Sequence, residues 1–286
     1  IAHNLAALPA ACQAAKWHGA RLGFDAEDFH GGELPDLPEN ALNRELIQAL
    51  ERHYLPRCDY LTAASPGIAR AYAQTYQLKE PVVVLNVFPL SEAPAQATDQ
   101  GRAMPGPSLY WFSQTIGPDR GLETVIQAMG LSRSRPTLYL RGSLVPGYQD
   151  KLNSLADHQG VGGKLEFRQP AAPEEMARLA AEYDVGISSE PGHSQNNQLA
   201  LSNKLFTFLL AGVPILASAT PAQADIAEKL ADALWLYEQC DSLQLADLMD
   251  ALLQHPAVLA AARKKAWTFG QGRFNWDREG VAFLDE

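Results

Sequence analysis

Short apolar runs alternate with longer segments of helical periodicity along most of this chain. In the second half, the apolar runs predict strands at residues 109–112, 137–141, 165–168, 185–188, 215–218 and 234–237. Helical segments lie between them near 121–129, 148–159, 173–182, 203–211 and 221–230, and two more follow at 242–254 and 256–269. Because strands that alternate with helices form parallel sheets, the pattern predicts an α/β domain.

The first half alternates in the same way. Its strands are predicted at 21–25, 59–64 and 81–86, and its helices at 5–17, 40–54 and 65–76. We expect Asn40 and Ser65 to cap the last two helices, the second with a proline directly after the cap. The helix over 40–54 is expected to bury the apolar stripe of Leu42, Leu46, Ile47 and Leu50.

A change of composition separates the two halves. Residues 91–107 are rich in Pro, Gly and Ala and carry little apolar pattern, as in a linker. We therefore expect a first domain over 1–95, a linker over 96–107, a second domain over 108–270 and a tail over 271–286. The aromatic residues of the tail either pack back onto the first domain or form an ordinary hydrophobic end.

Composition narrows the class of protein. The chain has 286 residues, of which 47 % are hydrophobic and 20 % charged, as in globular proteins. Its net charge of −10 argues against a nucleic-acid partner, because nonspecific binding to nucleic acid needs clustered Lys and Arg. Three cysteines show neither disulfide nor zinc spacing, which favours the cytoplasm. No apolar run is long enough to span a bilayer.

Polar loops at predicted strand ends are the first candidates for a site, because ligands of parallel sheets bind at the carboxyl ends of the strands. Three such loops occupy residues 113–121, 142–143 and 189–202. Ser202 is expected to cap the helix that starts at Asn203, and Lys204 lies in its first turn, where a cation opposes the helix dipole. Together with Arg120 and free N–H groups, Lys204 suits a diphosphate. Alternatively, Arg120 merely pairs with a neighbouring carboxylate.

Other candidates are carboxylates. Glu190, directly after a strand, either caps a turn or bonds ligand hydroxyls. Asp25, Glu27 and Asp28 follow a strand in the first half, but no supporting His, Asp or Glu set elsewhere indicates a metal. The GxGxxG, GK[ST] and GxSxG motifs are absent, which argues against dehydrogenases, P-loop enzymes and α/β hydrolases.

Segment 203–214, which reads NKLFTFLLAGVP, resembles the donor-site segment of retaining, family-4-type glycosyltransferases of the GT-B fold. Segment 116–122 resembles their diphosphate loop, and Ser65-Pro66 and segment 86–89 resemble parts of their first domain. The resemblance spans nearly the whole chain. It implies two Rossmann-like domains that face each other across a cleft, with the donor on the second domain and the acceptor on the first.

The same resemblance assigns roles to individual residues. Contacts to the donor diphosphate are expected from Arg120, Lys204, Asn203, Ser202 and Gly117. Contacts to the nucleotide are expected from Gly142, Ser143 and Thr207, and catalytic roles fall to Glu27, His3 and Glu190. Stabilising the leaving diphosphate is the main catalytic task, so neither a metal nor a cofactor is expected.

Two departures from the family pattern stand out. The two family glutamates fall at Thr207 and near Leu199, neither of which is acidic, and Glu190 is the nearest carboxylate. In the first domain, His3 matches a family histidine, Glu27 stands near the position of a second one, and the strands that should precede His3 are missing. We therefore expect a truncated first domain, either because the chain is a fragment or because the domain is reduced.

The sequence thus predicts a glycosyltransferase that moves a hexosyl group, with retention, from a UDP- or GDP-linked sugar to a glycan or lipid-linked acceptor. Peripheral contact with a membrane-bound acceptor fits this prediction. One alternative is a non-catalytic nucleotide- or glycan-binding remnant of the same fold, which the missing glutamates favour. A nucleotide-sugar epimerase is the weaker alternative.

Overall fold

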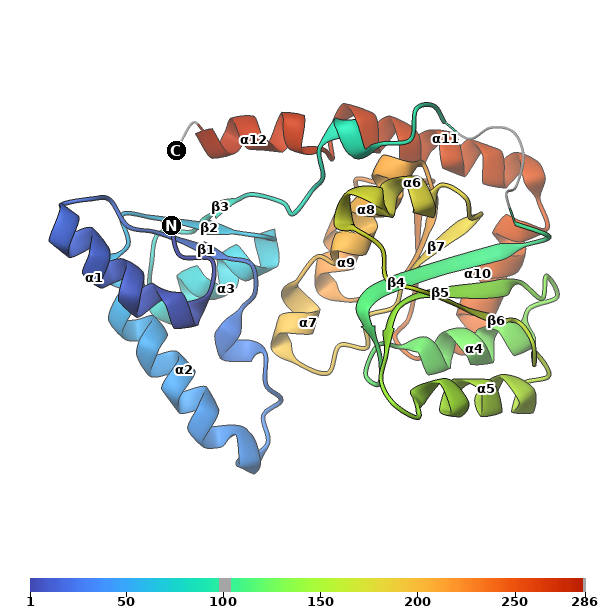
Figure 1. Ribbon diagram of the computed structural model, residues 1–286, viewed down its shortest axis with the longest axis horizontal. Helices are drawn as coiled ribbons and strands as arrows, with labels where there is room; N and C mark the ends of the chain where they lie inside the picture. Colours follow the sequence, from blue (N-terminus) through green and yellow to red (C-terminus); the bar gives the residue numbers. More distant parts are fainter. Residues whose placement is uncertain (98–103, 285–286) are drawn as a thin grey trace.

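The computed structural model describes residues 1–97 and 104–284 and contains two parallel sheets. One sheet has three strands in the order β1-β2-β3, and the other has six in the order β6-β5-β4-β7-β8-β9. Figure 1 shows them as separate layered units, with the first in blue and the second from green to red. The predicted α/β class with two parallel units is confirmed. Residues 98–103 of the predicted linker lie outside the described residues.

The first sheet consists of β1 (Gly23–Ala26), β2 (Tyr60–Ala63) and β3 (Val82–Val83). Its helices are α1 (Leu8–His18), α2 (Ala41–Tyr54) and α3 (Pro66–Tyr76). Ser65 caps α3 as predicted, since its side chain accepts a hydrogen bond from the backbone N–H of Ile68. Ala2 adds a single parallel bridge to Phe24 at the edge of the sheet.

Expectations for α2 are met only in part. Asn40 makes no capping bond, because its side-chain amide donates to the carbonyl of Pro35 instead. Of the predicted stripe, Ile47 and Leu50 pack against the core of the first sheet, whereas Leu42 and Leu46 are 77 % and 59 % exposed. The fully buried residue of α2 is Glu51, whose carboxylate accepts hydrogen bonds from Tyr72 and Tyr76. Burial raises the pKa of Glu51, and the two tyrosines satisfy its oxygens.

The second sheet carries the larger core. Its strands are β4 (Ser108–Ile116), β5 (Thr137–Leu144), β6 (Leu165–Arg168), β7 (Val185–Ser188), β8 (Ile215–Ser218) and β9 (Leu234–Tyr237). Its helices are α4 (Leu122–Leu131), α5 (Tyr148–His158), α6 (Met176–Ala180), α7 (Gln195–Leu199), α8 (Asn203–Ala211), α9 (Pro221–Ala227), α10 (Ser242–Leu253) and α11 (Pro256–Gly272). One core cluster includes buried side chains of α4, α5 and α10, and another those of α6, α8 and α9. Helices therefore cover both faces of this sheet.

Short 3₁₀ turns complete the described structure at Leu5–Ala7, His30–Gly32, Pro38–Asn40, Leu55–Arg57, Leu90–Glu92 and Pro173–Glu175. The first of these precedes α1, and the last leads into α6. No helix among the described residues is long and apolar enough to cross a membrane.

Two of the predicted loops are partly strand. β4 continues through Ile116, and β5 through Leu144, where Thr115 and Ile116 pair with Ser143 and Leu144 beyond an irregularity in register. Expecting loops at 113–116 and 142–143 was therefore wrong. Polar side chains on these strand ends interrupt the apolar run that indicated a strand, although the backbone hydrogen bonds continue.

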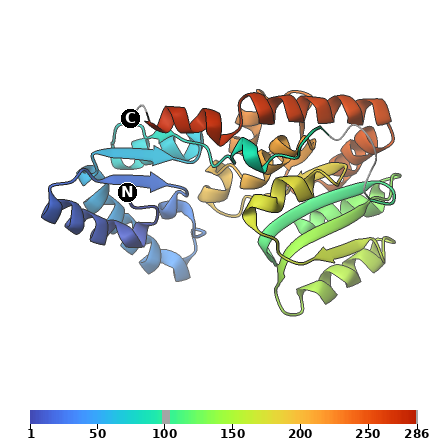
Figure 2. The same ribbon diagram turned by 45° about the horizontal axis from the view of Figure 1, so that its top comes forward.

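Helices α7 and α12 (Trp276–Leu284) were not expected as elements. α12 begins after α11 and extends toward the first sheet, above β3 in Figures 1 and 2. The N–H groups of Leu85 and Leu90 donate to Glu279 and Asp277 at 2.9 Å each, and the N–H of Trp276 donates to the carbonyl of Phe88 at 2.9 Å. The tail thus bonds to the segment that leaves the first sheet, whereas its Phe274 packs in the core of the second sheet. The predicted packing of the aromatic tail onto the first domain stays a prediction.

Candidate active site

A cleft of about 920 Å³ lies between the two sheets. Glu27, Asp28, Asn86 and Phe88 form its first wall, which belongs to the first sheet and the segment after it. The second wall comes from the strand ends and loops of the second sheet. Among the residues predicted for the site, the cleft is lined by Glu27, Arg120, Ser143, Glu190, Ser202, Asn203, Lys204 and Thr207.

Lys204 is the most enclosed cation of the second wall, with its side chain 11 % exposed. Its Nζ lies 3.0 Å from Oε1 of Glu190 and 3.1 Å from Oγ of Ser202, and 5.5 Å from the centre of the Trp111 ring. Ser202 therefore does not cap α8 with its side chain, as the sequence had suggested, but accepts a hydrogen bond from Lys204. The carboxylate and the indole face compensate the cost of burying the ammonium group beside a helix N-terminus.

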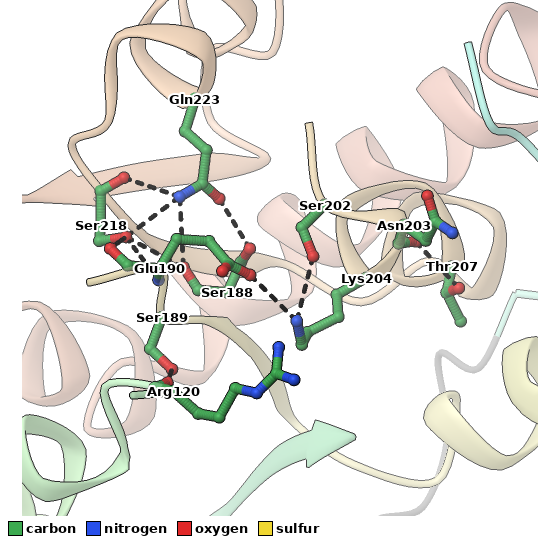
Figure 3. A network of polar contacts seen from close by, with 10 residues as sticks. All are labelled: Arg120, Ser188, Ser189, Glu190, Ser202, Asn203, Lys204, Thr207, Ser218 and Gln223. Atoms are coloured by element: carbon green, nitrogen blue, oxygen red, sulfur yellow. Dashed lines mark hydrogen bonds and ion pairs between the residues drawn. The ribbon is translucent and has the colours of Figure 1, made fainter. Parts of the chain in front are cut away.

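Glu190 is held in place by a buried network of hydroxyl and amide groups (Figure 3). The Glu190 N–H donates to Oγ of Ser218 at 2.8 Å, and the Ser218 hydroxyl lies 2.8 Å from the Glu190 carbonyl. Gln223 of α9 donates to the Ser218 carbonyl at 2.9 Å and accepts a bond from the Ser188 hydroxyl at 2.7 Å. These bonds tie the ends of β7 and β8 together and fix the backbone from which the Glu190 carboxylate reaches Lys204.

Arg120 reaches the same place from a different loop. Figure 3 shows its side chain extending toward the Lys204 ammonium group. Among the described residues, no carboxylate pairs with Arg120: Asp119 faces His193 at 3.4 Å, and Glu123 bonds to Lys151 at 2.9 Å. Two cations thus share one corner of the cleft with one carboxylate, which leaves a local excess of positive charge suited to an anion.

Asn203 and Thr207 flank Lys204 on α8 and also line the cleft. The Thr207 hydroxyl donates to the Asn203 carbonyl at 3.1 Å, a local helix bond that leaves its oxygen able to accept. Arg141, at the inner part of β5, also lines the cleft and was not predicted. Its Nε donates to the Tyr110 hydroxyl and one terminal nitrogen to the Gln169 carbonyl, both at 2.7 Å.

The first wall is more exposed. Glu27 lies at its surface, where partial burial and then the nearby Asp25 carboxylate raise its pKa above the usual value of 4.5. Oδ2 of Asp25 lies 3.1 Å from Nδ1 of His3, and its Oδ1 accepts a bond from the Thr62 hydroxyl at 2.5 Å. One ligand atom from each of His3, Asp25 and Glu27 lies within 4.8 Å of the others. These three residues could hold a metal ion, but exposed acidic groups commonly lie together without one. The predicted absence of a metal therefore stays a prediction.

Three predicted residues lie away from the surface of the cleft. His3 adjoins it through Asp25 but is not part of its lining, and its side chain is 65 % exposed. Gly117 lies against Val145, where an added Cβ would come within 2.9 Å of a methyl group. Gly142 lies inside the sheet at φ 151°, with the Ser113 carbonyl 2.3 Å from the position of a Cβ. Packing alone explains both glycines, and the proposed ligand contacts of all three residues stay predictions.

The residues that sequence reasoning missed lie mainly behind the site. Ser218 and Gln223 do not line this cleft. Ser218 bonds to the backbone of Glu190, and Gln223 bonds to Ser218, so together they fix the position of Glu190. The available signal was weak: a buried strand that ends in serine, followed by a Thr-Pro helix start with glutamine in its first turn. Arg141 gave a clearer signal, since a charged residue inside an apolar strand requires a partner or a ligand.

The arrangement favours binding and stabilising a compact, multiply charged anion. Arg120 and Lys204 converge from two elements, and the first turn of α8, whose Asn203 and Lys204 line the cleft, has backbone N–H groups that no helix bond uses. An anion that gains charge during a reaction would be stabilised more strongly here than in water, because the surrounding groups are already fixed. The carboxylate of Glu190 occupies part of the same corner in the described structure.

Comparisons with known proteins place this geometry in a structural context. No protein-family model matches the sequence, and no curated protein matches it. Among solved structures, HepE from Anabaena in complex with UDP has a TM-score of 0.78 and 16 % identity, covering 99 % of this chain and 76 % of HepE. The structure of HepE with UDP-glucose has a TM-score of 0.77 and 17 % identity, covering 99 % of this chain and 76 % of that one.

Sucrose-phosphate synthase from Thermosynechococcus elongatus has a TM-score of 0.75 and 17 % identity, covering 98 % of this chain and 77 % of that one. At this level of identity the likeness concerns the fold. It extends over both parallel sheets, because 98 % or more of this chain is covered. The chain therefore has the α/β architecture of GT-B glycosyltransferases, with two Rossmann-like domains that face each other across a cleft.

Proposed function

We propose that this protein is a glycosyltransferase that takes a hexosyl group from a nucleotide-diphosphate sugar, UDP- or GDP-linked. The observation that carries the proposal is the convergence of Arg120 and Lys204 at the N-terminus of α8 inside the interdomain cleft. Structural neighbours of the same fold were solved with UDP and with UDP-glucose, which supports a donor of this class. The sequence of α8 supports a retaining, family-4-type reaction.

Each site residue has a role that follows from its position in the cleft. As the bond between the sugar and the diphosphate breaks, negative charge grows on the leaving diphosphate, and Arg120 and Lys204 stabilise it. Glu190 gives up its bond to Lys204 when the diphosphate arrives and is then placed near the transferred sugar. These two cations perform the charge neutralisation, so the proposed reaction uses no metal and no cofactor.

The acceptor belongs on the first wall. Glu27 and Asp28 line the cleft opposite the cations, and carboxylates there bond the hydroxyl groups of a glycan or lipid-linked acceptor. His3 is oriented by Asp25 beside them. We place the protein in the cytoplasm, where its three free cysteines fit a reducing environment and a membrane-borne acceptor is reached from the surface.

A non-catalytic binding protein is the second candidate. Thr207 lines the same cleft as Arg120, Lys204 and Glu190, which together form the diphosphate corner. The resemblance predicts a carboxylate at its position, and its hydroxyl bonds to its own helix. Such a protein would bind the nucleotide and leave the donor intact. Detection of released hexose or of a glycosylated product excludes this candidate.

The proposal is tested by calorimetric titration of UDP, GDP and ADP into the wild-type chain and into Arg120→Ala. One nucleoside diphosphate should bind, and the variant should bind it with about 1.5–3 kcal/mol less free energy, the usual value of a hydrogen bond to a charged group. Arg133→Ala is the matched control, because Arg133 is exposed and does not line the cleft. Equal affinities of wild type and Arg120→Ala would refute the assignment.

A further inference from the structure

Asn196 is a buried side chain beside the cleft that the proposed reaction leaves without a role. It lies on α7, between β7 and α8, and is 8 % exposed. Its Oδ1 accepts a hydrogen bond from the backbone N–H of Phe29 at 2.7 Å, and its Nδ2 donates to Oδ1 of Asp28 at 2.6 Å. One side chain from the second sheet therefore holds both the backbone and a side chain of the loop that follows β1.

That loop forms the first wall of the cleft. Glu27 and Asp28 line the cavity, and Phe29 is buried directly behind them. From its own side, the loop is held by Tyr72, whose hydroxyl lies 3.1 Å from the Asp28 carbonyl. Asn196 supplies the matching contact from across the cleft. The position of the two carboxylates relative to the cations thus depends on where α7 lies.

The segment that carries Asn196 also carries Glu190 and Lys204, two of the three charged residues of the diphosphate corner. Glu190, at one end of residues 189–204, bonds to Lys204 at the other end. Between them, the Leu199 carbonyl accepts a bond from the Ser65 hydroxyl at 2.6 Å, which is a second link to the first sheet. A ligand that exchanges the Glu190–Lys204 contact for its own therefore acts on the segment that positions the opposite wall.

We propose that Asn196 is a positioning residue that couples occupation of the diphosphate corner to the placement of Glu27 and Asp28. The inference rests on the proposed function, because a diphosphate is the ligand that would take Lys204 from Glu190. Coupling between two sites is reciprocal: if the ligand fixes the loop through Asn196, then the Asn196 bonds favour the ligand. Loss of these bonds should weaken diphosphate binding even though Asn196 touches no part of the corner.

The first test titrates UDP by calorimetry into the full chain carrying Asn196→Ala, Asn196→Asp or the double change D28N/N196D. Asn196→Ala should bind UDP about three- to tenfold more weakly, because only part of the free energy of its two hydrogen bonds is coupled to the ligand. Asn196→Asp keeps an acceptor for Phe29 but sets two carboxylates against each other, so it should also bind weakly. In D28N/N196D the amide and the carboxylate exchange places, and wild-type affinity should return.

The second test follows hydrogen exchange at the Phe29 amide. Saturation with UDP should slow this exchange in wild type and in D28N/N196D, whereas Asn196→Ala should show fast exchange that UDP leaves unchanged. A purely structural role would raise the exchange rate without altering the affinity for UDP. Equal UDP affinities of Asn196→Ala and wild type, or failure of D28N/N196D to recover, would overturn the inference. Where the wild-type chain binds GDP and not UDP, the same titrations use GDP. A wild-type chain that binds neither contradicts the proposed function instead, and Phe29 exchange in D28N/N196D then decides the positioning role.

Discussion

The two walls of the cleft hold their charged groups in opposite ways. On the second wall, Lys204 and Glu190 are 11 % and 14 % exposed, and buried Ser218 and Gln223 fix the backbone beneath them. On the first wall, Glu27 is exposed and lies next to other carboxylates. A group that stabilises a fixed charge must be rigid before the ligand arrives, whereas a group that binds a variable hydroxyl tolerates solvent. Under the proposed function, the difference assigns charge stabilisation to the second wall and binding of the acceptor to the first.

The largest effect should follow from removing the buried cation. Lys204→Ala leaves the Glu190 carboxylate buried without its partner, which costs about 3–5 kcal/mol of folding free energy. Thermal or urea unfolding measures this loss. Lys151→Ala is the control, since the Lys151–Glu123 pair is half exposed and should contribute about 1 kcal/mol or less. If both variants lose equally little, the second wall is not the rigid one.

The next effect concerns the close packing of α11 against α8. An added Cβ at Gly270 of α11 would lie 2.2 Å from the Leu209 carbonyl, so Gly270→Ala should push α11 away from α8 and cost about 1–3 kcal/mol. Gly272→Ala, two residues further along the same helix, meets nothing within 4 Å and should be neutral or stabilising. Unfolding midpoints of the two variants should therefore diverge. Similar midpoints would show that α8 does not need this close approach.

A third prediction separates the two uses of Glu190. In the described structure its carboxylate competes with any anion for Lys204. Glu190→Gln removes the competing charge and should bind UDP roughly tenfold more tightly, since hydrogen bonds between charged groups exceed neutral ones by about 1 kcal/mol or more. Calorimetric titration with UDP, which carries no hexosyl group, measures this effect alone. Unchanged or weaker binding would mean that Glu190 shapes the corner rather than competing in it.

The smallest effect belongs to the exposed wall. Folding raises the pKa of Glu27, so its contribution to stability is complete below the unfolded pKa and is lost as pH rises through the folded pKa. Glu27→Gln removes that loss and should unfold at a slightly higher temperature than wild type at pH 7, with no gain at pH 4. Thermal unfolding at the two pH values provides the comparison. A variant less stable than wild type at pH 7 would show that Glu27 is held by favourable contacts.

The fold could be predicted mainly where one signal dominates. β6 to β9 consist of short apolar or alternating runs between clear helices, and their bounds follow from the sequence alone. β4 and β5 extend further than expected, because Ser113 to Thr115 and Ser143 are polar on account of the cleft and not because the strand ends. α7 and α12 were missed because their amphipathic pattern is matched to partners distant in sequence, namely the loop after β1 and the segment around Leu85.

The sequence indicated which residues belong to the candidate site, but it did not indicate which of them contact one another. Arg120 and Lys204 were found because cations beside strand ends and helix starts are unusual, and both line the cleft. The same reasoning could not foresee that the Ser202 hydroxyl accepts a hydrogen bond from Lys204 instead of capping α8. A small hydroxyl residue at this position suits either contact. Gln223 and Asn196 act on residues 35 and 168 positions away, a separation at which no local pattern carries information.

The return of α12 has a mechanical consequence. The polypeptide passes between the two sheets twice, once along residues 85–90 and once where α11 ends and α12 begins. These two passages run beside each other and are joined by the bonds from Trp276 to Phe88 and from Leu90 to Asp277. Two adjacent, mutually bonded passages restrict sliding and twisting of one sheet against the other more than a single passage would. Rotation about these passages would also have to break the bonds that Asn196 and Leu199 form with the first domain, so the tail and α7 together hold the cleft in one shape.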